Sequence, residues 1–168
     1  MTMKLRVFPR RGLVFFSAHG RLTASAMIGA CRLCLRHPDF RPGQKQLFDL
    51  TEVTGFDCSA SGLLSLQAKQ LDLFAWDGAE TLIVYHAPHR AAQDIAQRVL
   101  RPRGSMKGVI PRIQEHEADA LSLLGQPETS FADFLAMADQ PCSAPPQPSP
   151  GRSTGYAPTR RGRHPDTH

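Results

Sequence analysis

The stretch QKQLFDLTEVTGFDCSASGLLSLQAKQ, residues 44–70, passes from an apolar strand through a short polar turn into an amphipathic helix. The apolar run QLFDL predicts the strand, and we expect the helix to open at Asp57-Cys58-Ser59. A helix start presents unpaired backbone N–H groups and the positive end of the helix dipole. Asp57 or Ser59 can cap these groups, and an anion or phosphoryl group can also be held there. From local physics alone, a cap without further function is the simpler interpretation.

The helix that follows this turn is predicted to pack on a sheet. Its apolar residues form a broad face, because two further leucines widen the main stripe, and a broad face is typical of a helix lying on strands. Asp77-Gly78 is expected to end the helix. The main stripe consists of Leu63, Leu64, Ala68, Leu71, Phe74 and Ala75, and Leu66 and Leu73 widen it.

The segment before residue 44 predicts a β-hairpin and a helix. The apolar runs LRVF (5–8) and LVFFSA (13–18) are joined by PRRG, in which Pro9 and Gly12 supply turn geometry. Gly20 is expected to end the second strand. Apolar residues at helical spacing then predict a helix over 24–36, capped by Thr23 or Ser25 and ended by Pro38.

The segment after residue 78 alternates between strands and helices. TLIVY (81–85) predicts a central strand that is buried on both faces, and Pro88 suits the first turn of a helix that runs to Pro102. KGVIPRI (107–113) predicts an edge strand, since Pro111 has no N–H to give to a ladder. Two helical segments, 115–124 and 131–137, follow.

The fold class predicted from this order is α/β, with an N-terminal β-hairpin and then alternating strands and helices. We expect a mostly parallel five-stranded sheet with helices packed on it. Residues 1–138 are predicted to form this single domain. Residues 139–168 hold seven of the 14 prolines without apolar periodicity, so they are predicted to be a disordered tail rich in Pro and Arg.

The net charge of +5 is unevenly distributed. Residues 1–45 carry nine Lys or Arg against one acid, whereas residues 46–138 carry seven against 12. A polarised chain of this kind favours docking to a partner protein or self-association, so a homodimer is one expectation. No secretory leader or membrane span is recognisable, and we expect a cytoplasmic protein.

The other chemistry-bearing residues do not form a convincing site. Cys31 and Cys34 lie inside the predicted helix on its apolar face, so they are interpreted as small buried hydrophobic residues. No metal or other cofactor is expected, because the histidines lack metal-binding spacing; those considered are His86, His89 and His116. Nucleic-acid binding is disfavoured, since no aromatic residue is interleaved with the arginines of the tail. We find no nucleophile–base pair either, so an enzyme is the least supported class.

With these elements in place, the opening stretch resembles the anti-sigma-factor-antagonist (STAS, SpoIIAA-like) domain. The resemblance rests on Asp49-Leu50, Thr51, Val53-Thr54 and then Asp57-Cys58-Ser59-Ala60 before an apolar helix, and the element order agrees over about residues 3–124. It is closest to a divergent subgroup of proteobacterial type that is similar to the lipid-binding SEC14 fold. The resemblance implies a regulatory protein–protein interaction module without catalysis.

In the STAS family a partner kinase phosphorylates a serine at the start of this helix. Cys58 occupies that position here, and a thiol is not a substrate for a serine kinase, so we expect the module to work without the usual phosphoserine switch. The expected binding and regulatory residues are Asp57, Cys58, Ser59 and Ser61, and the expected partner is a protein of regulator or kinase type. A phosphate on Ser59 or Ser61 stays an open alternative.

Two other functions remain open at this stage. An apolar-ligand or lipid-surface binder of SEC14-like character is the alternative to the interaction module, because large apolar residues accompany a basic N-terminal third; these residues are Phe15, Phe16, Phe74 and Trp76. A thiol sensor at Cys58 is the other, because a helix N-terminus lowers the pKa of a cysteine, although neighbouring Asp57 acts in the opposite direction.

Overall fold

The computed structural model describes residues 2–74, 80–100 and 108–138. Three features of the sequence predictions therefore lie outside the described residues: the helix end at Asp77-Gly78, the apolar residue Trp76 and the disordered tail in 139–168.

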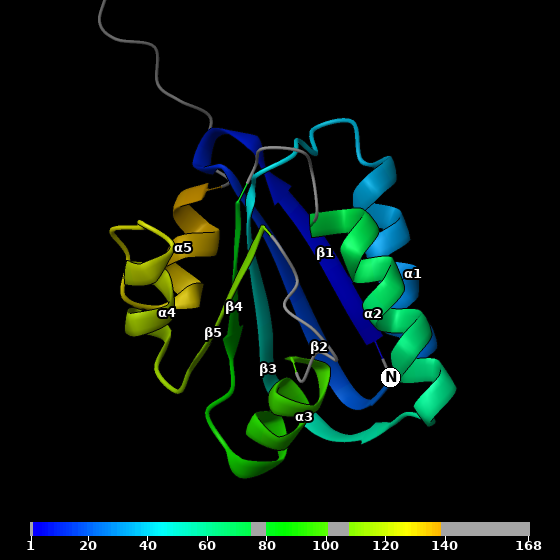
Figure 1. Ribbon diagram of the computed structural model, residues 1–168. Coiled ribbons are helices and arrows are strands. Elements are labelled where there is room, and N and C mark those ends of the chain that lie inside the picture. Colours follow the sequence, from blue (N-terminus) through cyan, green and yellow to red (C-terminus); the bar gives the residue numbers. More distant parts are fainter. Residues whose placement is uncertain (1, 75–79, 101–107, 139–168) are drawn as a thin grey trace, which may run out of the picture.

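The described residues form one five-stranded sheet with helices on both faces (Figure 1). The strand order is β1-β2-β3-β4-β5, in which β1 and β2 are antiparallel and the other three pairs are parallel. The predicted α/β fold class, with an N-terminal hairpin and a mostly parallel five-stranded sheet, is confirmed. In chain order the elements are β1 (Thr2–Phe8), the 3-10 turn η1 (Pro9–Arg11), β2 (Leu13–Thr23), α1 (Ala24–Arg36), β3 (Lys45–Asp57), α2 (Ala60–Phe74), β4 (Thr81–His86), α3 (Arg90–Leu100), β5 (Val109–Gln114), α4 (Glu117–Leu123) and α5 (Phe131–Ala138).

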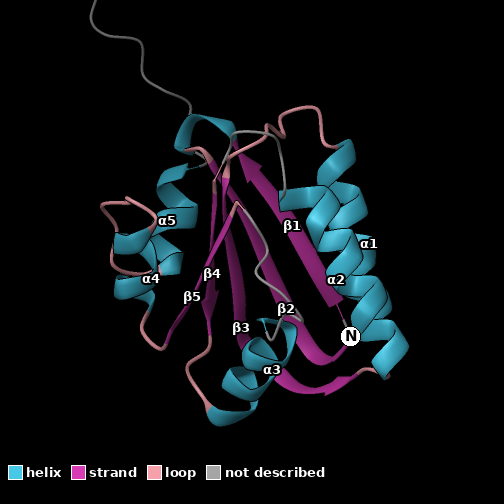
Figure 2. Ribbon diagram, viewed as in Figure 1, coloured by secondary structure: helices cyan, strands magenta, loops and turns pink. Residues whose placement is uncertain are grey.

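The sheet separates two hydrophobic cores (Figure 2). Helices α1 and α3 contribute to one core, which also contains Leu66 and Leu73 of α2, and helices α4 and α5 contribute to the other. Alternation along β4 sends Ile83 and Tyr85 into the first core and Val84 into the second. The prediction of a central strand buried on both faces is confirmed, as is the edge position of β5 with Pro111.

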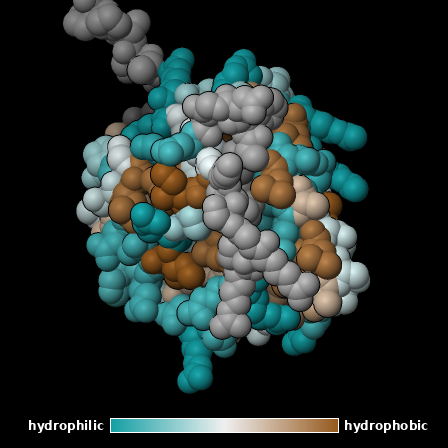
Figure 3. Space-filling model, viewed as in Figure 1, coloured by the Kyte–Doolittle hydropathy of each residue, from teal (hydrophilic) through white to brown (hydrophobic). Residues whose placement is uncertain are grey.

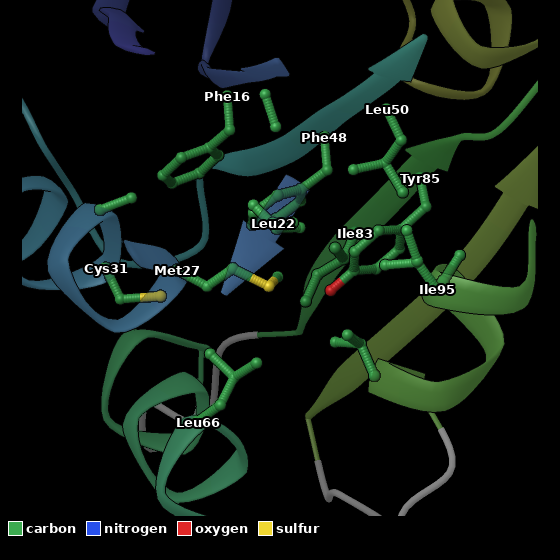
Figure 4. Close-up of a cluster of buried hydrophobic side chains, with 14 of the residues drawn as sticks. Phe16, Leu22, Met27, Cys31, Phe48, Leu50, Leu66, Ile83, Tyr85 and Ile95 are labelled. Carbon is green, nitrogen blue, oxygen red and sulfur yellow. The ribbon is translucent and has the colours of Figure 1, made fainter. Parts of the chain in front are cut away.

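Three stacked rings link the central strands inside the first core (Figure 4). Phe16, Phe48 and Tyr85 occupy adjacent positions on β2, β3 and β4. The rings of Phe16 and Phe48 lie 4.3 Å apart and almost parallel, and those of Phe48 and Tyr85 lie 4.9 Å apart. Phe48 is 1% exposed, so it contributes both buried area and ring contacts to two neighbouring strands.

Two strands are longer than the sequence predicts. Gly20 does not end β2, which continues to Thr23, and β3 continues to Asp57 through the segment expected to be a polar turn. The two extensions pair with each other in parallel, so each satisfies the backbone groups of the other. Gly20 adopts a positive φ of 78° beside an irregularity in this pairing, where it permits a bend instead of a strand end.

The prediction for the buried face of α2 is wrong. Leu66, Gln70 and Leu73 are buried, whereas Leu64 and Leu71 are 52% and 40% exposed. Both stripes carry leucines, and side chains two positions apart on a helix point about 200° apart. The packing of α2 against α1 and the sheet therefore selects the stripe that the sequence ranked second.

The remaining helix predictions are mostly confirmed. Thr23 caps α1, since its Oγ1 accepts a hydrogen bond from the Ala26 N–H at 3.2 Å. Cys31 and Cys34 are buried free thiols, as expected. Helix α3 begins at Arg90 and not at Pro88, because His89 caps it by accepting from the Ala92 N–H through Nδ1.

One argument for a lipid-surface binder is also corrected. Phe15 and Phe16 are 4% and 1% exposed and belong to the two cores, so neither offers apolar surface to a ligand or a bilayer. Within the described ranges, no helix has the length and hydropathy that crossing a membrane requires.

The ring stack makes Phe48 the position where truncation should cost most. Phe48→Ala is expected to lower the free energy of unfolding by about 3–5 kcal/mol, because it removes a buried ring and leaves a cavity between two strands. Urea unfolding followed by circular dichroism measures this change. Phe48→Leu keeps much of the volume and should cost clearly less, so equal losses in the two variants would contradict a role for the stacked rings.

Candidate functional site

The residues singled out from the sequence lie together where β3 ends and α2 begins, and we call Asp57, Cys58, Ser59 and Ser61 the docking corner. Ser59 caps α2, since its Oγ accepts a hydrogen bond from the Gly62 N–H at 3.0 Å. The Oγ of Ser61 lies 3.1 Å from the same oxygen. Both serines are exposed, so the start of α2 faces solvent as expected.

Asp57 contributes an ion pair and not a helix cap. It is the last residue of β3, and its carboxylate accepts hydrogen bonds from Arg21 Nε at 2.7 Å and Nη2 at 2.5 Å. These bonds hold the pKa of Asp57 below its ordinary value and raise the pKa of Arg21. Both side chains are exposed, so the pair orients two charges at the surface more than it stabilises the fold.

Gly55 allows Arg21 to reach Asp57. Arg21 lies opposite Gly55 in the parallel pairing of β2 with β3, and a Cβ at Gly55 would come within 3.1 Å of the guanidinium. The missing side chain therefore leaves the space in which the arginine crosses the strand. A similar close approach occurs at Gly62, where an added Cβ would lie 3.3 Å from the Cβ of Ala24, so the first turns of α1 and α2 are packed tightly together.

Cys58 does not have the environment of a reactive thiol. Its side chain is half-buried, and its thiol donates a hydrogen bond to the Ser59 carbonyl at 3.3 Å. Burial raises the pKa of Cys58 even though Arg98 acts to lower it. A raised pKa reduces the thiolate fraction at neutral pH, which argues against the thiol-sensor hypothesis.

An exposed apolar stripe on α2 continues from the docking corner. Ser61, Leu64, Ala68 and Leu71 are all exposed, and their spacing places them on one side of the helix. Leu33 on the neighbouring helix α1 is 62% exposed. Hydrophobic surface is visible on the side of the molecule where α1 and α2 lie (Figure 3). The corner and this stripe together form a surface that we call the α2 surface.

Sequence reasoning missed a polar cluster where the pairing of β3 with β4 ends. The Oδ1 of Asp49 accepts hydrogen bonds from the Thr51 N–H at 3.0 Å and the Thr51 hydroxyl at 2.6 Å, and lies 3.2 Å from His86 Nδ1. Asp49 and His86 face each other in the parallel register of the two strands. The signal in the sequence was a polar residue close to the end of each apolar run, Asp49 in QLFDL and His86 directly after TLIVY.

The two histidines near this cluster have structural roles. His86 is 3% exposed and meets the ring of Phe131 edge-on at 4.8 Å, which places it between the sheet and α5. His89 uses Nδ1 to cap α3, and its Nε2 donates to the Thr51 carbonyl at 3.0 Å. In the part of the chain that the structure describes, no group of three His, Cys, Asp or Glu side chains is placed to hold a metal ion.

Two opposing effects act on the pKa of Asp49 in this half-buried cluster. Burial alone raises the pKa of Asp49, but hydrogen bonds from His86 and Thr51 more than offset that effect. The pKa of Asp49 therefore lies below its ordinary value, and the carboxylate is charged in the folded protein at neutral pH. The cluster links β3 to β4 by charge and hydrogen bonding, and the ring contact of His86 with Phe131 adds α5.

No family model matches this chain, and no curated protein matches it. Among solved structures, it is similar to an uncharacterized protein from the DUF3478 family with a SpoIIAA-like fold from Shewanella loihica PV-4. The identity is 21%, the match covers 73% of this chain and 92% of that one, and the TM-score is 0.42.

The depressed pKa of Asp49 predicts how the stability of the protein depends on pH. The ionised carboxylate stabilises the fold above the pKa of an unfolded aspartate, about 3.9, and this contribution disappears as the pH falls through the lower folded pKa. Asp49→Asn should lower the free energy of unfolding by about 1–3 kcal/mol at pH 7. The difference from the wild type should shrink below about pH 4, which urea unfolding at a series of pH values measures.

Glu52→Gln is the matched control for this prediction, because it makes the same carboxyl-to-amide change three residues later on an exposed side chain paired with His19. It should alter stability by less than about 0.5 kcal/mol. An Asp49→Asn variant that resembles this control, or whose deficit persists unchanged into acid, would show that the charge of Asp49 does not stabilise the fold.

The thiol environments predict the order in which three cysteines are alkylated. The fourth, Cys142, lies outside the described residues and is replaced in a Cys142→Ser background. Cys58 should react with iodoacetamide at pH 7.5 more slowly than a cysteine in an unstructured peptide, because its pKa is raised. Cys31 and Cys34 should react only on unfolding, because burial raises the pKa of each to about 12. Mass spectrometry over time measures all three, and the protein in urea gives the unfolded rates. Faster alkylation of Cys58 than of the peptide would contradict this prediction and favour the thiol-sensor hypothesis.

Proposed function

We propose that the protein is a non-catalytic, cytoplasmic regulatory module that binds a partner protein through the α2 surface. The observation that carries this proposal is the exposed leucine stripe beside a polar corner on one helix. Leu64 and Leu71 are large apolar side chains left in solvent, although the same helix buries Leu66 and Leu73 almost completely. An apolar stripe bordered by polar residues is typical of protein interaction sites.

The energetics of the surface favour docking by a helix or a shallow groove of the partner. Complete burial of an exposed leucine contributes about 1.5–3 kcal/mol, so Leu64 and Leu71 can supply the central contacts of an interface. Asp57 and Arg21 lie at the border of that surface with their charges fixed by two hydrogen bonds. Ordered charges at a rim favour one orientation of the partner.

The docking corner supports an interaction without the usual phosphoserine switch. Cys58 stands at the position of the family's phosphorylated serine, and its hydrogen bond to the Ser59 carbonyl keeps the thiol within the turn. Ser59 caps α2, which leaves Ser61 as the hydroxyl that a kinase could modify with least disturbance to the helix. A phosphate there would add about −1.5 to −2 charges beside the leucine stripe and change docking directly.

The proposed partner is a protein of regulator or kinase type, and a second copy of this chain is the alternative. The buried positions of Phe15 and Phe16 remove part of the reason for a lipid-surface binder. In this proposal the leucine stripe, with the paired charges of Arg21 and Asp57 at its border, docks a folded partner and not a bilayer.

Site-specific crosslinking tests this function in the native cell. A photo-crosslinking residue at position 64 should give one reproducible protein adduct, because this position lies at the centre of the α2 surface. The adduct should be lost in a Leu71→Ser variant, whose stability should stay within about 0.5 kcal/mol of the wild type because the side chain is exposed.

Position 123 is the matched control. Leu123 is also an exposed leucine (42%), but its helix α4 packs against the opposite face of the sheet. The same adducts from positions 64 and 123, or none from position 64, would contradict docking through the α2 surface. An adduct of twice the chain mass identifies the partner as a second copy.

A further inference from the structure

Helices on opposite faces of the sheet differ in charge. Residues 115–138, which include α4 and α5, contain five acids and no Lys or Arg. Helix α1 lies on the other face of the sheet and contains Arg32 and Arg36 but no acid (Figure 1). The uneven charge of the sequence is therefore separated by the sheet, and the function proposed above does not use it.

The outer side of α1 combines an apolar side chain with two available positive charges. Leu33 is 62% exposed, more than any other large apolar side chain that the structure describes. Arg32 and Arg36 are exposed, and among the described residues neither has a hydrogen bond, an ion pair or a ring contact. Arg36 lies one turn beyond Leu33 on the same side of the helix, so the two side chains can contact one partner together.

Helix α4 presents the complementary pair of side chains. Leu123 is 42% exposed, and Asp119 lies one turn before it on the same side of the helix. Asp119 is exposed and has no hydrogen bond or ion pair within the described ranges. Glu117 on the same helix is already used, since it accepts a hydrogen bond from the Phe131 N–H at 2.6 Å. Asp119 is therefore the acid that α4 offers to another molecule.

The two surfaces match when α1 and α4 of different copies pack antiparallel. With Leu33 against Leu123, the rise along a helix places Arg36 about 4.5 Å and Asp119 about 6 Å from the leucine contact, in the same direction. The two opposite charges therefore lie at nearly the same level. This arrangement also places the C-terminal end of α1 beside the N-terminal end of α4, where the helix dipoles attract each other.

Charge disfavours contacts between identical surfaces. Two α1 helices would bring Arg32 and Arg36 of both copies together with no acid on either helix. Two copies of residues 115–138 would bring acids together with no Lys or Arg. Like charges placed against each other at an interface oppose binding, whereas α1 against α4 joins opposite charges. The charges therefore select a contact between unlike surfaces.

We propose that the outer side of α1 binds α4 of a second copy of this chain, with Leu33 against Leu123 and Arg36 against Asp119. Because α1 and α4 lie on opposite faces of one sheet, a single neighbouring copy cannot occupy both. Each chain can therefore bind two others, and repetition of this contact produces rings or open chains and not a two-fold dimer. The contact is small, so association depends on protein concentration.

This contact goes beyond the function proposed above and uses neither the docking corner nor the leucine stripe of α2. Chains that associate through α1 and α4 leave Leu64 and Leu71 in solvent for another partner. In the crosslinking experiment, position 123 should then give an adduct of twice the chain mass that differs from the adduct at position 64. Failure of one contact leaves the other intact.

Sedimentation of the full chain at concentrations up to about 1 mM tests the contact. The average mass of the wild type is expected to rise with concentration, and the rise should weaken as salt increases from about 0.05 M to about 0.5 M. Arg36→Glu and Asp119→Arg should each weaken association by about tenfold or more, because each brings like charges together. An equimolar mixture of the two variants should associate again, because both of its mixed contacts join opposite charges.

Two control variants separate this contact from other causes of association. Asp94→Arg makes the same change as Asp119→Arg on an exposed acid of α3, which lies outside the contact, and should associate like the wild type. Leu71→Ser should also associate like the wild type, whereas a dimer through the α2 surface would be lost. Leu33→Ser keeps the charges of α1 and should weaken association.

Circular dichroism checks that every variant is folded, and Leu33→Ser tests the α1 surface independently of Arg36→Glu. A wild type that stays monomeric at the highest concentration would overturn the proposal. Association of Asp119→Arg equal to that of the wild type, loss of association in either control, or a mixture of the two charge variants that stays monomeric would also overturn it.

Discussion

The long parallel pairing of β2 with β3 is the constraint on which the rest of the structure depends. It runs from Leu13↔Lys45 to Thr23↔Asp57, well beyond the buried centre of the sheet, and each strand satisfies the backbone groups of the other. Both strands end at the same place, so α1 and α2 also begin side by side. The close approach of Ala24 and Gly62 follows from this shared end.

The same pairing explains why the docking corner looks as it does. Arg21 and Asp57 can form two hydrogen bonds because their strands remain paired up to the last residue, with Gly55 leaving room between them. The tight contact at the first turns limits how α2 can rotate about its axis. The packing of α2 against α1 and the sheet buries Leu66 and Leu73 and leaves Leu64 and Leu71 in solvent, where a partner can reach them.

Near α5, hydrogen bonding and charge add to the hydrophobic packing that stabilises the sheet. The two faces of the sheet carry separate hydrophobic cores, but near α5 the half-buried carboxylate of Asp49 also joins β3 to β4 through its hydrogen bond with His86. A charge is tolerated there because every hydrogen bond to Asp49 favours its ionised form. The chain thus combines a densely packed centre with an exposed apolar stripe on α2.

Local sequence patterns determined the elements and their order. The periodicity of apolar residues, together with Gly and Pro at the ends of elements, identifies the hairpin, the buried strand at 81–85, the edge strand with Pro111 and the buried pair Cys31 and Cys34. Each of these signals lies within a few residues of the chain. The docking corner was found in the same way, from a polar turn followed by an apolar helix.

Only the tertiary structure decided where strands end, which helix face is buried and which distant polar groups meet. β2 and β3 continue past their apolar runs because each supplies hydrogen bonds to the other, and no local window contains both strands. α2 has leucines on two sides, so its buried side depends on what α1 and the sheet present to it. Asp49 meets His86 only because the register of β3 and β4 aligns them across 37 residues of chain.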